Sequence, residues 1–267
     1  MARTLASLPS GSRITDYISL GVVSRAIPRG KIDSILAETG KTSLRQGELP
    51  AHLVVYYVIA LALYMQFSYR EVLRCLLGGI QWLSKPEETV RATGKSGLSQ
   101  ARSRLGAEPL RRLYEQVVVP IASEHTRGSR YRAWRLISLD GSTLDVAATE
   151  ENEGAFGRPP ASPGASAYPQ LRFVALLENG THVLLGGRMA SYATNEITLA
   201  KEVITQLKPG MLCLADRFFF GFTLWTKAQA SGCDLLWRVR KHLRLEVRER
   251  WSDGSYSSAI YPSEKDA

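Results

Sequence analysis

The order of strand-like and helix-like segments after Tyr131 constrains the fold of this chain more than any other feature. Three apolar, β-rich runs come first, at 134–139, 171–177 and 181–185, and the letters ENGTH supply a hairpin turn between the last two. A helical stretch, a strand, a helix and a strand then follow, at 195–207, 211–215, 221–231 and 234–239. The predicted order is therefore βββαβαβ.

The residues up to about position 125 have a different pattern. Apolar residues recur there at helical spacing, bounded by Gly and Pro, in 32–39, 50–67, 69–78 and 109–124. We therefore predict an α+β, or mixed α/β, chain of two domains: a helical DNA-binding or accessory domain over 1–128 and a mixed domain over 129–267. Three antiparallel strands followed by αβαβ is the order of the ribonuclease-H-like fold, and order alone also allows other mixed α/β folds.

The charge balance points to a polyanionic partner. Lys and Arg number 34 against 25 Asp and Glu, which gives a net charge of +9. Nucleic acid is favoured over an anionic membrane surface, because basic side chains that neutralise phosphates release condensed counterions. The longest apolar run, 53–65, is shorter than the roughly 20 residues that a membrane-spanning helix needs, and 1–21 has no signal-peptide pattern. We expect a core helix at 53–65, no membrane span, and a cytoplasmic location.

Two aspartates have the sequence context of metal ligands. Asp140 ends the apolar run WRLISLD, and Asp216 ends MLCLAD. A carboxylate at the carboxyl end of a strand can be solvated and bind a hard cation, and the predicted order would make these two strands neighbours. A single strand-end Asp more often caps the next turn, but two in register favour one or two Mg²⁺ ions and phosphodiester chemistry. Asp145 is expected to have a local or indirect role.

Candidate DNA contacts fall in two places. In KSGLSQARSRL, Ser96 can cap a helix that exposes Ser99, Arg102 and Arg104 and buries Leu98, Ala101 and Leu105. A plain solvated helix face explains that pattern equally well. After the second Asp, cations alternate with apolar or aromatic residues, and we expect phosphate contacts from four of them: Arg217, Arg238, Arg240 and Lys241. The Gly- and Pro-rich stretch 150–170 is predicted to be a loop, which could border the active site.

Seven segments of the chain match a known sequence pattern: ITDYISLGVVSRAIPRGKIDSILAETG, SGLSQARSRLG, LDGSTLDV, NEGAFGRP, YPQLRFVALLENGTH, LADRFFFGFTLW and GCDLLWRVRKHLRL. Together they resemble the insertion-sequence-four family of bacterial DDE transposases. The resemblance runs in order from about Ile14 onward. It implies a ribonuclease-H-like catalytic domain, Mg²⁺ or Mn²⁺ as cofactor, and double-stranded DNA of transposon inverted repeats as substrate. It further implies a homodimer in the active complex and Asp140 and Asp216 as the first two acids of the triad.

The third acid of that family departs from this pattern. It is a Glu within a Tyr, Arg, Glu, Lys motif on a later helix, after a β-rich insertion that this chain enters before its last residue. The later glutamates Glu246, Glu249 and Glu264 lack that context, and we interpret the first two as solvated strand charges. We therefore expect a truncated domain that binds DNA but cuts slowly alone. The main alternative is a noncatalytic DNA-binding remnant, and a nuclease unrelated to transposition is a third.

Overall fold

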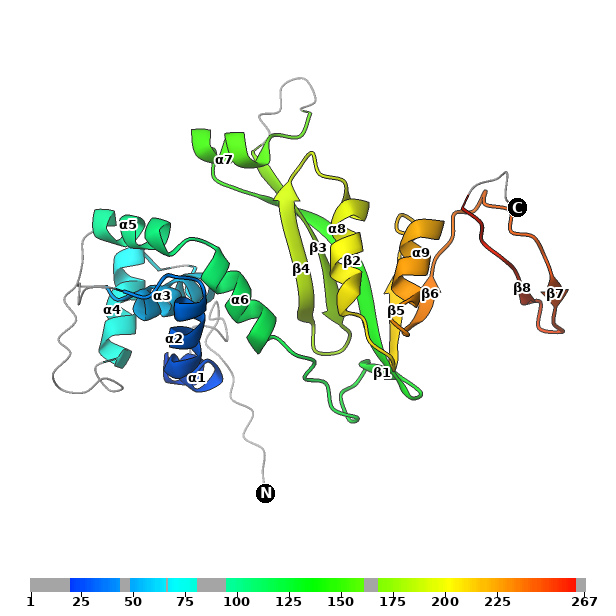
Figure 1. Cartoon of the computed structure of the whole chain (residues 1–267), viewed down its shortest axis with the longest axis horizontal. Helices are drawn as coiled ribbons and strands as arrows, with labels where there is room; N and C mark the ends of the chain where they lie inside the picture. The colour runs from blue at the N-terminus through cyan, green and yellow to red at the C-terminus, as the bar shows by residue number, and fades with distance from the viewer. Residues whose placement is uncertain (1–19, 44–48, 66, 81–94, 161–167, 263–267) are drawn as a thin grey trace, which may run out of the picture. The chain divides into compact units, whose positions relative to one another are not determined.

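The computed structural model describes residues 20–43, 49–65, 67–80, 95–160 and 168–262 (Figure 1). Its contacts divide the chain into two compact units, Met1–Val117 and Val118–Ala267. Each unit has its own hydrophobic core. The predicted division after residue 128 stays a prediction, and residues 118–128 belong to the second compact unit.

The first unit is helical, as the apolar spacing predicts. Its helices are α1 (Leu20–Ala26), α2 (Arg29–Glu38), α3 (Ala51–Leu63), α4 (Tyr69–Ile80), α5 (Lys95–Leu105) and α6 (Glu108–Val117). The apolar helix α3 lies in the core, where Val55 and Tyr57 are almost fully buried. Within the described ranges, no helix is both long and apolar enough to cross a bilayer.

Helix α6 is shorter than predicted. The pattern favours a helix through Glu124, but α6 ends at Val117. Pro120 disfavours helical conformation at the residue before it and has no amide hydrogen to donate. The β-branched run Val117–Val119 that precedes it also has low helix propensity, so the chain leaves the helix early.

A mixed six-stranded sheet forms the second unit. Its strands are β1 (Arg130–Tyr131), β2 (Trp134–Asp145), β3 (Gln170–Glu178), β4 (Val183–Ser191), β5 (Met211–Ala215) and β6 (Asp234–Trp237). The order across the sheet is β4-β3-β2-β5-β6, and β1 pairs with β2. Strands β2, β3 and β4 are antiparallel neighbours, whereas β5 and β6 run parallel to β2. The predicted βββαβαβ order is present, with β1 added in front and helix α7 (Glu150–Phe156) added between β2 and β3.

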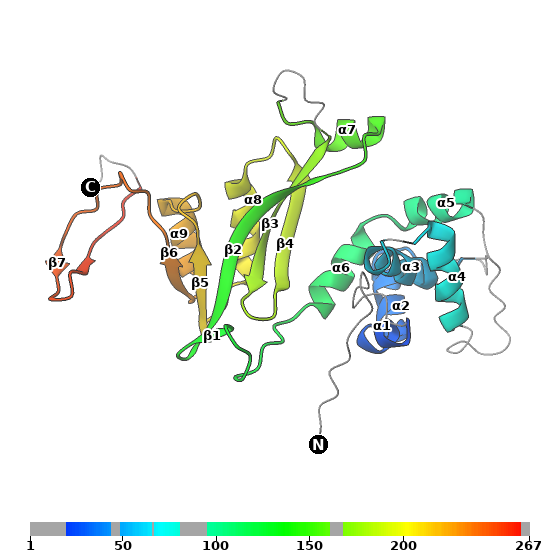
Figure 2. The same cartoon turned by 180° about the vertical axis from the view of Figure 1, so that it is seen from behind.

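Two helices cover one face of this sheet. Helices α8 (Glu196–Val203) and α9 (Phe222–Gln229), with the 3-10 turn η2 (Ile204–Gln206) after α8, pack against the inward residues of the strands (Figure 1). Ile137 and Leu139 of β2 are buried in this core. The opposite face, toward the viewer in Figure 2, is open: Met189 is 70% exposed and Leu236 is 62% exposed.

Two segments outside this layer differ in how well the sequence predicts them. The stretch predicted as a loop contains helix α7 (Glu150–Phe156), because Thr149 accepts a hydrogen bond from the amide of Asn152 and caps it. The predicted hairpin near the C-terminus is confirmed. Strands β7 (Glu249–Arg250) and β8 (Tyr256–Ser257) pair on either side of the turn that contains Asp253 and Gly254.

A buried carboxylate holds the start of the second unit to its sheet. Glu178, the last residue of β3, is fully buried and forms an ion pair with Arg135 of β2. It also accepts hydrogen bonds from the amides of Ile121 and Ala122, at 3.1 and 3.0 Å, and from the hydroxyl of Thr181 at 2.5 Å. Its acceptor capacity is therefore used inside the protein.

Candidate active site

Asp140 lies where strand β2 separates from β5. The parallel pairing with β5 ends at Leu139↔Ala215, but the antiparallel pairing with β3 continues through Asp140↔Ala175 to the end of β2 at Asp145. The prediction that Asp140 ends its strand is therefore wrong. The ladder with β3 holds its backbone on one side, while the other side is released from pairing.

Asp216 occupies the corresponding place on β5. It directly follows Ala215, the last residue of the strand, and begins a tight turn. Its Oδ1 accepts a hydrogen bond from the amide of Phe218 at 3.0 Å, and its backbone carbonyl accepts one from the amide of Phe219 at 3.0 Å. The turn-forming role expected of a single strand-end Asp is thus present here, and it uses one carboxylate oxygen.

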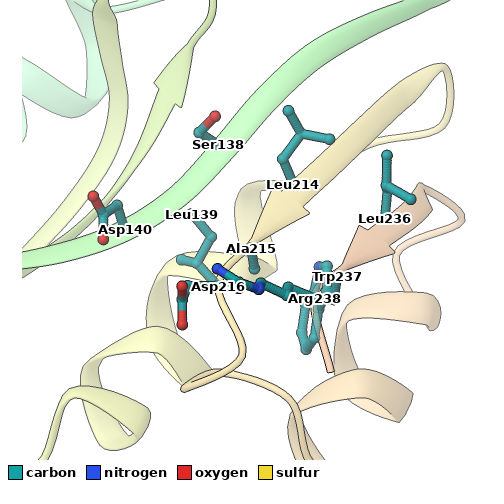
Figure 3. A pocket seen from close by; sticks show the side chains of 9 residues that line it. All are labelled: Ser138, Leu139, Asp140, Leu214, Ala215, Asp216, Leu236, Trp237 and Arg238. Carbon is teal, nitrogen blue, oxygen red and sulfur yellow. The ribbon is translucent and has the colours of Figure 1, made fainter. Parts of the chain in front are cut away.

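The register of the two strands brings these aspartates together. Leu139 and Ala215 are direct partners on neighbouring parallel strands, which lie about 4.8 Å apart, and each aspartate is the next residue of its strand. Both carboxylates are exposed and line one pocket of about 570 Å³ (Figure 3). The prediction that they lie on adjacent strands of one sheet is confirmed. Their catalytic role stays a prediction.

The walls of this pocket come from three strand ends. Besides the two aspartates and their neighbours in the strands, the lining residues are Ser138, Leu214, Leu236, Trp237 and Arg238. Figure 3 shows Arg238 reaching from the end of β6 toward Asp216. Sequence reasoning missed Ser138, Leu214 and Leu236. The alternation of side chains along a strand could have found the first two, since each lies two residues before an aspartate.

Each aspartate retains acceptor capacity. Asp140 accepts a hydrogen bond from the amide of Gly141 to Oδ1 at 2.8 Å, and Asp216 accepts the bond from Phe218 already described. In the part of the chain that the structure describes, neither carboxylate forms an ion pair with a Lys, Arg or His side chain. Both can therefore offer oxygen to a ligand from solvent.

Gly141 separates this pair from a third nearby acid. A Cβ atom on Gly141 would lie 3.0 Å from Glu196 Oε2, at the start of α8. Because successive residues of a strand point to opposite faces, Asp140 points away from Glu196. Glu196 instead pairs with Arg172 at 3.7 Å. Among the described residues, no group of three or more His, Cys, Asp or Glu is arranged to hold a metal ion.

The later glutamates Glu246 and Glu249 and the cysteines Cys213 and Cys233 are not among the residues that line the pocket. Glu246 accepts a hydrogen bond from the hydroxyl of Tyr261 at 3.3 Å, Glu249 is exposed in β7, and Glu264 lies outside the described residues. Burial raises the pKa of Cys213 to about 12 and also raises the pKa of Cys233. These two thiols are therefore protonated at neutral pH and are poor nucleophiles or metal ligands.

The predicted exposed face of α5 is confirmed. Ser99, Arg102 and Arg104 are exposed, whereas Leu98, Ala101 and Leu105 are buried. The predicted cap at Ser96 is wrong, because α5 already includes Lys95. The guanidinium of Arg102 lies 5.8 Å from the ring centre of Tyr69. Contact of this face with DNA stays a prediction.

The cations after the second aspartate are all exposed, and the structure separates them. Arg238 lines the pocket of the aspartate pair, whereas Arg240 lines a second cleft of about 780 Å³ with Phe220 and His242. Arg217 and Lys241 are not among the lining residues of either. Their predicted phosphate contacts remain untested.

Asp140 lies where the parallel pairing of β2 with β5 ends and Asp216 directly follows β5, and such an exposed pair of acids is the arrangement of a candidate phosphoryl-transfer site. Comparison with known proteins finds sequences similar to this chain. Residues 17–115 match the family described as Insertion element 4 transposase N-terminal. Transposase InsG for insertion sequence element IS4, from Escherichia coli K12, is 25% identical over 246 residues, which cover 90% of this chain and 51% of InsG. The predicted resemblance is confirmed: this chain is similar to an IS4 transposase over most of its length.

A second relative gives the same result. The putative transposase InsZ of Escherichia coli K12 is 24% identical over 212 residues, which cover 79% of this chain and 68% of InsZ. A piggyBac transposase synaptic complex with hairpin DNA aligns with 87% of this chain and 53% of that chain, at 13% identity and a TM-score of 0.39, too low to define a shared fold. The chain spans about half the length of InsG.

Proposed function

We propose that this chain is a DNA transposase of the DDE type, which cuts and joins DNA at transposon inverted repeats by divalent-metal-dependent phosphoryl transfer. The observation that carries the proposal is the register of β2 and β5. It makes Asp140 and Asp216 neighbours at the mouth of one pocket, with both carboxylates exposed. The similarity to InsG and InsZ, both named transposases, supports the same function.

A ribonuclease-H-like fold for the second unit belongs to this proposal. Its support is the sheet order β4-β3-β2-β5-β6, with three antiparallel strands followed by two strands parallel to β2. Helix α8 leads from β4 to β5 and helix α9 connects β5 to β6, both on one face of the sheet. Asp140 then lies where the parallel β2–β5 ladder ends and Asp216 directly follows the carboxyl end of β5, a place where ligands commonly bind in open α/β sheets.

The residues present fit a magnesium or manganese ion. Mg²⁺ is often held by one or two carboxylates, with water and substrate phosphate completing its shell, and Asp140 and Asp216 supply two carboxylates with free acceptor capacity. When bound, such ions stabilise the negative charge that develops on the attacking and leaving oxygens of a phosphodiester. The described residues that line the pocket include no His or Cys, a ligand set that favours a hard cation over zinc.

The chain's own residues would position the DNA around this pair. The β3 ladder fixes the backbone of Asp140, and the exposed position of the pocket gives a duplex access to it. Arg238 brings a guanidinium to the same pocket, where it can donate charge-assisted hydrogen bonds to phosphate oxygens. A net charge of +9 supports DNA as the partner, and a homodimer in the active complex is part of the proposal.

The direct test measures Mn²⁺ binding by the 267-residue chain, for example by electron paramagnetic resonance of free Mn²⁺. We expect Asp140→Asn and Asp216→Asn each to weaken Mn²⁺ binding at least about tenfold, because each removes a charged ligand. Asp145→Asn is the matched control on the same strand, where Asp145 accepts a bond from Gln170 at 2.7 Å. Equal Mn²⁺ affinity in all four proteins would overturn the assignment.

A noncatalytic DNA-binding protein is the second candidate. It is favoured by the finding that the described residues hold no three-ligand acidic group. With Mg²⁺ and inverted-repeat DNA, we expect this chain to bind and to cut very slowly or not at all. A version extended to the length of InsG should cut, and Asp140→Ala should abolish cutting without loss of binding. If the extended protein binds but never cuts, the noncatalytic function is correct.

A further inference from the structure

We propose that the hairpin of residues 130–135, at the end of the sheet away from the aspartate pair, binds the phosphate backbone of duplex DNA. This inference rests on the proposed function, which makes DNA the partner, and adds a contact surface to it. We call this segment the RYRAWR hairpin, after its sequence. In Figure 1 it lies at the labelled strand β1, where β2 begins.

The turn of this hairpin holds an arginine in an unusual backbone conformation. Arg130 pairs with Arg135 and Tyr131 with Trp134, which leaves Arg132 and Ala133 as a two-residue turn. Arg132 has a φ of 52°, a left-handed conformation that Gly or Asn adopts more easily. Backbone strain of this kind is concentrated at functional sites, which points to a role for the Arg132 side chain.

Aromatic stacking holds that side chain in place. The rings of Tyr131 and Trp134 are stacked, with centroids 6.3 Å apart and an interplanar angle of 6°. The guanidinium of Arg132 lies 5.4 Å from the ring centre of Tyr131. The indole of Trp134 donates a hydrogen bond to Asp234 at 2.5 Å, which ties the pair to strand β6. An arginine ordered in this way loses less conformational freedom when it binds an anion.

The charge of Arg132 is available to an external partner. Arg132 is exposed and forms no ion pair with any acid in the part of the chain that the structure describes. By contrast, Arg135 forms an ion pair with the buried Glu178, and the guanidinium of Arg130 donates a hydrogen bond to the carbonyl of Ala133 at 3.2 Å. The hairpin therefore presents one free, stacked guanidinium at its tip.

Neighbouring turns add positive charge at the same end of the sheet. Exposed Arg127 lies in the turn before β1, and exposed Lys208 lies in the turn before β5. The amide of Arg135 donates to the carbonyl of Gly210 at 2.9 Å, which brings the β5 turn beside the hairpin. The described acids near this end are Glu124, Glu178 and Asp234, of which Glu178 is paired with Arg135 and Asp234 accepts the bond from Trp134. The excess of positive charge at this end of the sheet favours a polyanionic partner such as DNA over a basic protein surface.

Strand β2 sets the spacing between this surface and the aspartate pair. Arg132 and Asp140 are eight residues apart along nearly continuous strand, which corresponds to about 26 Å. At 3.4 Å per base pair, a duplex that follows the sheet would place the Arg132 contact about 8 base pairs from the phosphodiester at the aspartate pair. The contact should therefore matter only for duplexes that extend at least that far.

The test uses Arg132→Gly in the 267-residue chain. Glycine suits a φ of 52°, so this variant should fold at least as well as the wild type while losing the guanidinium. We expect its affinity for a 30-base-pair duplex to fall about five- to tenfold at 0.1 M salt, and its log-log salt slope to fall by about 0.9. Lys227→Ala on α9 removes one exposed positive charge elsewhere and should change neither by more than about twofold.

The possible outcomes separate this inference from the proposed function. Unchanged DNA affinity and salt slope in Arg132→Gly, with loss of affinity in Arg102→Ala with Arg104→Ala, would overturn the inference and leave DNA as the partner. Failure of the wild-type chain to bind any duplex would overturn both. If Arg132→Gly binds DNA normally but sediments differently from the wild type in the absence of DNA, the hairpin contacts a second copy of the chain instead, and the inference is overturned.

Discussion

Two carboxylates on neighbouring strands of the same sheet have opposite surroundings. Glu178 is fully buried, pairs with Arg135 and accepts three further hydrogen bonds. Asp140 is exposed and accepts a single bond, from the next residue along the chain. The difference shows that the hydrogen-bond partners of an acid, more than its place in a strand, decide whether it is structural or available to a ligand.

The pKa of Glu178 reflects the same surroundings. Burial by itself would raise the pKa of this carboxyl, but hydrogen bonds from Thr181, Ile121, Ala122 and Arg135 together outweigh burial and hold it below its usual value of 4.5. The ionised form is therefore the one that the fold stabilises.

Removing the Glu178 charge should have the largest effect on stability. We expect Glu178→Gln to lower the free energy of unfolding by about 3 kcal/mol, because it leaves Arg135 without its partner and turns an amide toward other donors. Urea unfolding followed by circular dichroism measures this. Glu202→Gln is the control, since Glu202 is 56% exposed in its pair with Arg188 and should change stability by less than about 0.5 kcal/mol. A similar loss in both variants would contradict the comparison.

The wild type and Glu178→Gln should also differ in how their free energies of unfolding depend on pH. Because the folded-state pKa of Glu178 is lowered, its contribution is fully present above the unfolded-state value near 4.5 and is lost as the pH falls through the folded-state value. The stability difference between wild type and Glu178→Gln should therefore be constant from pH 6 to 8 and shrink below about 4.5. A difference that grows in acid would mean that Glu178 is protonated in the folded protein.

A methyl group beside Asp140 should have an intermediate effect. We expect Gly141→Ala to destabilise the fold by about 1 to 2 kcal/mol, because the new Cβ would lie 3.0 Å from Glu196 Oε2 and 3.3 Å from Val174 Cγ2. Gly154→Ala within α7 has open space around it and should be neutral or stabilising by up to about 1 kcal/mol. Thermal unfolding of both variants measures the contrast, and equal shifts of their Tm would refute it.

The smallest effect on stability should come from the aspartate pair itself. Asp140→Asn and Asp216→Asn should each change the free energy of unfolding by less than about 0.5 kcal/mol, because the amide oxygen can still accept the one local bond that each makes. Chemical unfolding without divalent metal measures this. A loss of more than about 2 kcal/mol would show that these acids are structural, like Glu178.

Local patterns in the sequence predict much of this architecture. The strand at 211–215 matches β5 residue for residue, and apolar spacing correctly assigns the buried face of α5. The extension of β2 past Asp140 could not be predicted, because the ladder with β3 that sustains it joins distant residues. The Gly- and Pro-rich composition of 150–170 predicted a loop and gave no sign of α7, whose start depends on a single capping residue, Thr149.

Part of the candidate site could also be predicted from local sequence patterns. Asp140 and Asp216 each follow an apolar run, so their placement needs only the strand order. Glu178 gave no such signal, since its partner Arg135 lies 43 residues away in the sequence. Arg132 and Ala133 also lack the usual Asn or Gly of a two-residue turn, and only the backbone shows that Arg132 is strained.

The unequal pairing at the two aspartates has a consequence for the entropy of ligand binding. Asp140 sits on backbone already ordered by the β3 ladder, whereas Asp216 begins a turn beyond the last pair of β5. A ligand shared by both would therefore restrict mainly the turn at 216–219, since the torsions around Asp140 are fixed before it arrives. Affinity at this site should accordingly be tuned by the residues of that turn and, apart from Asp140 itself, only weakly by those of β2.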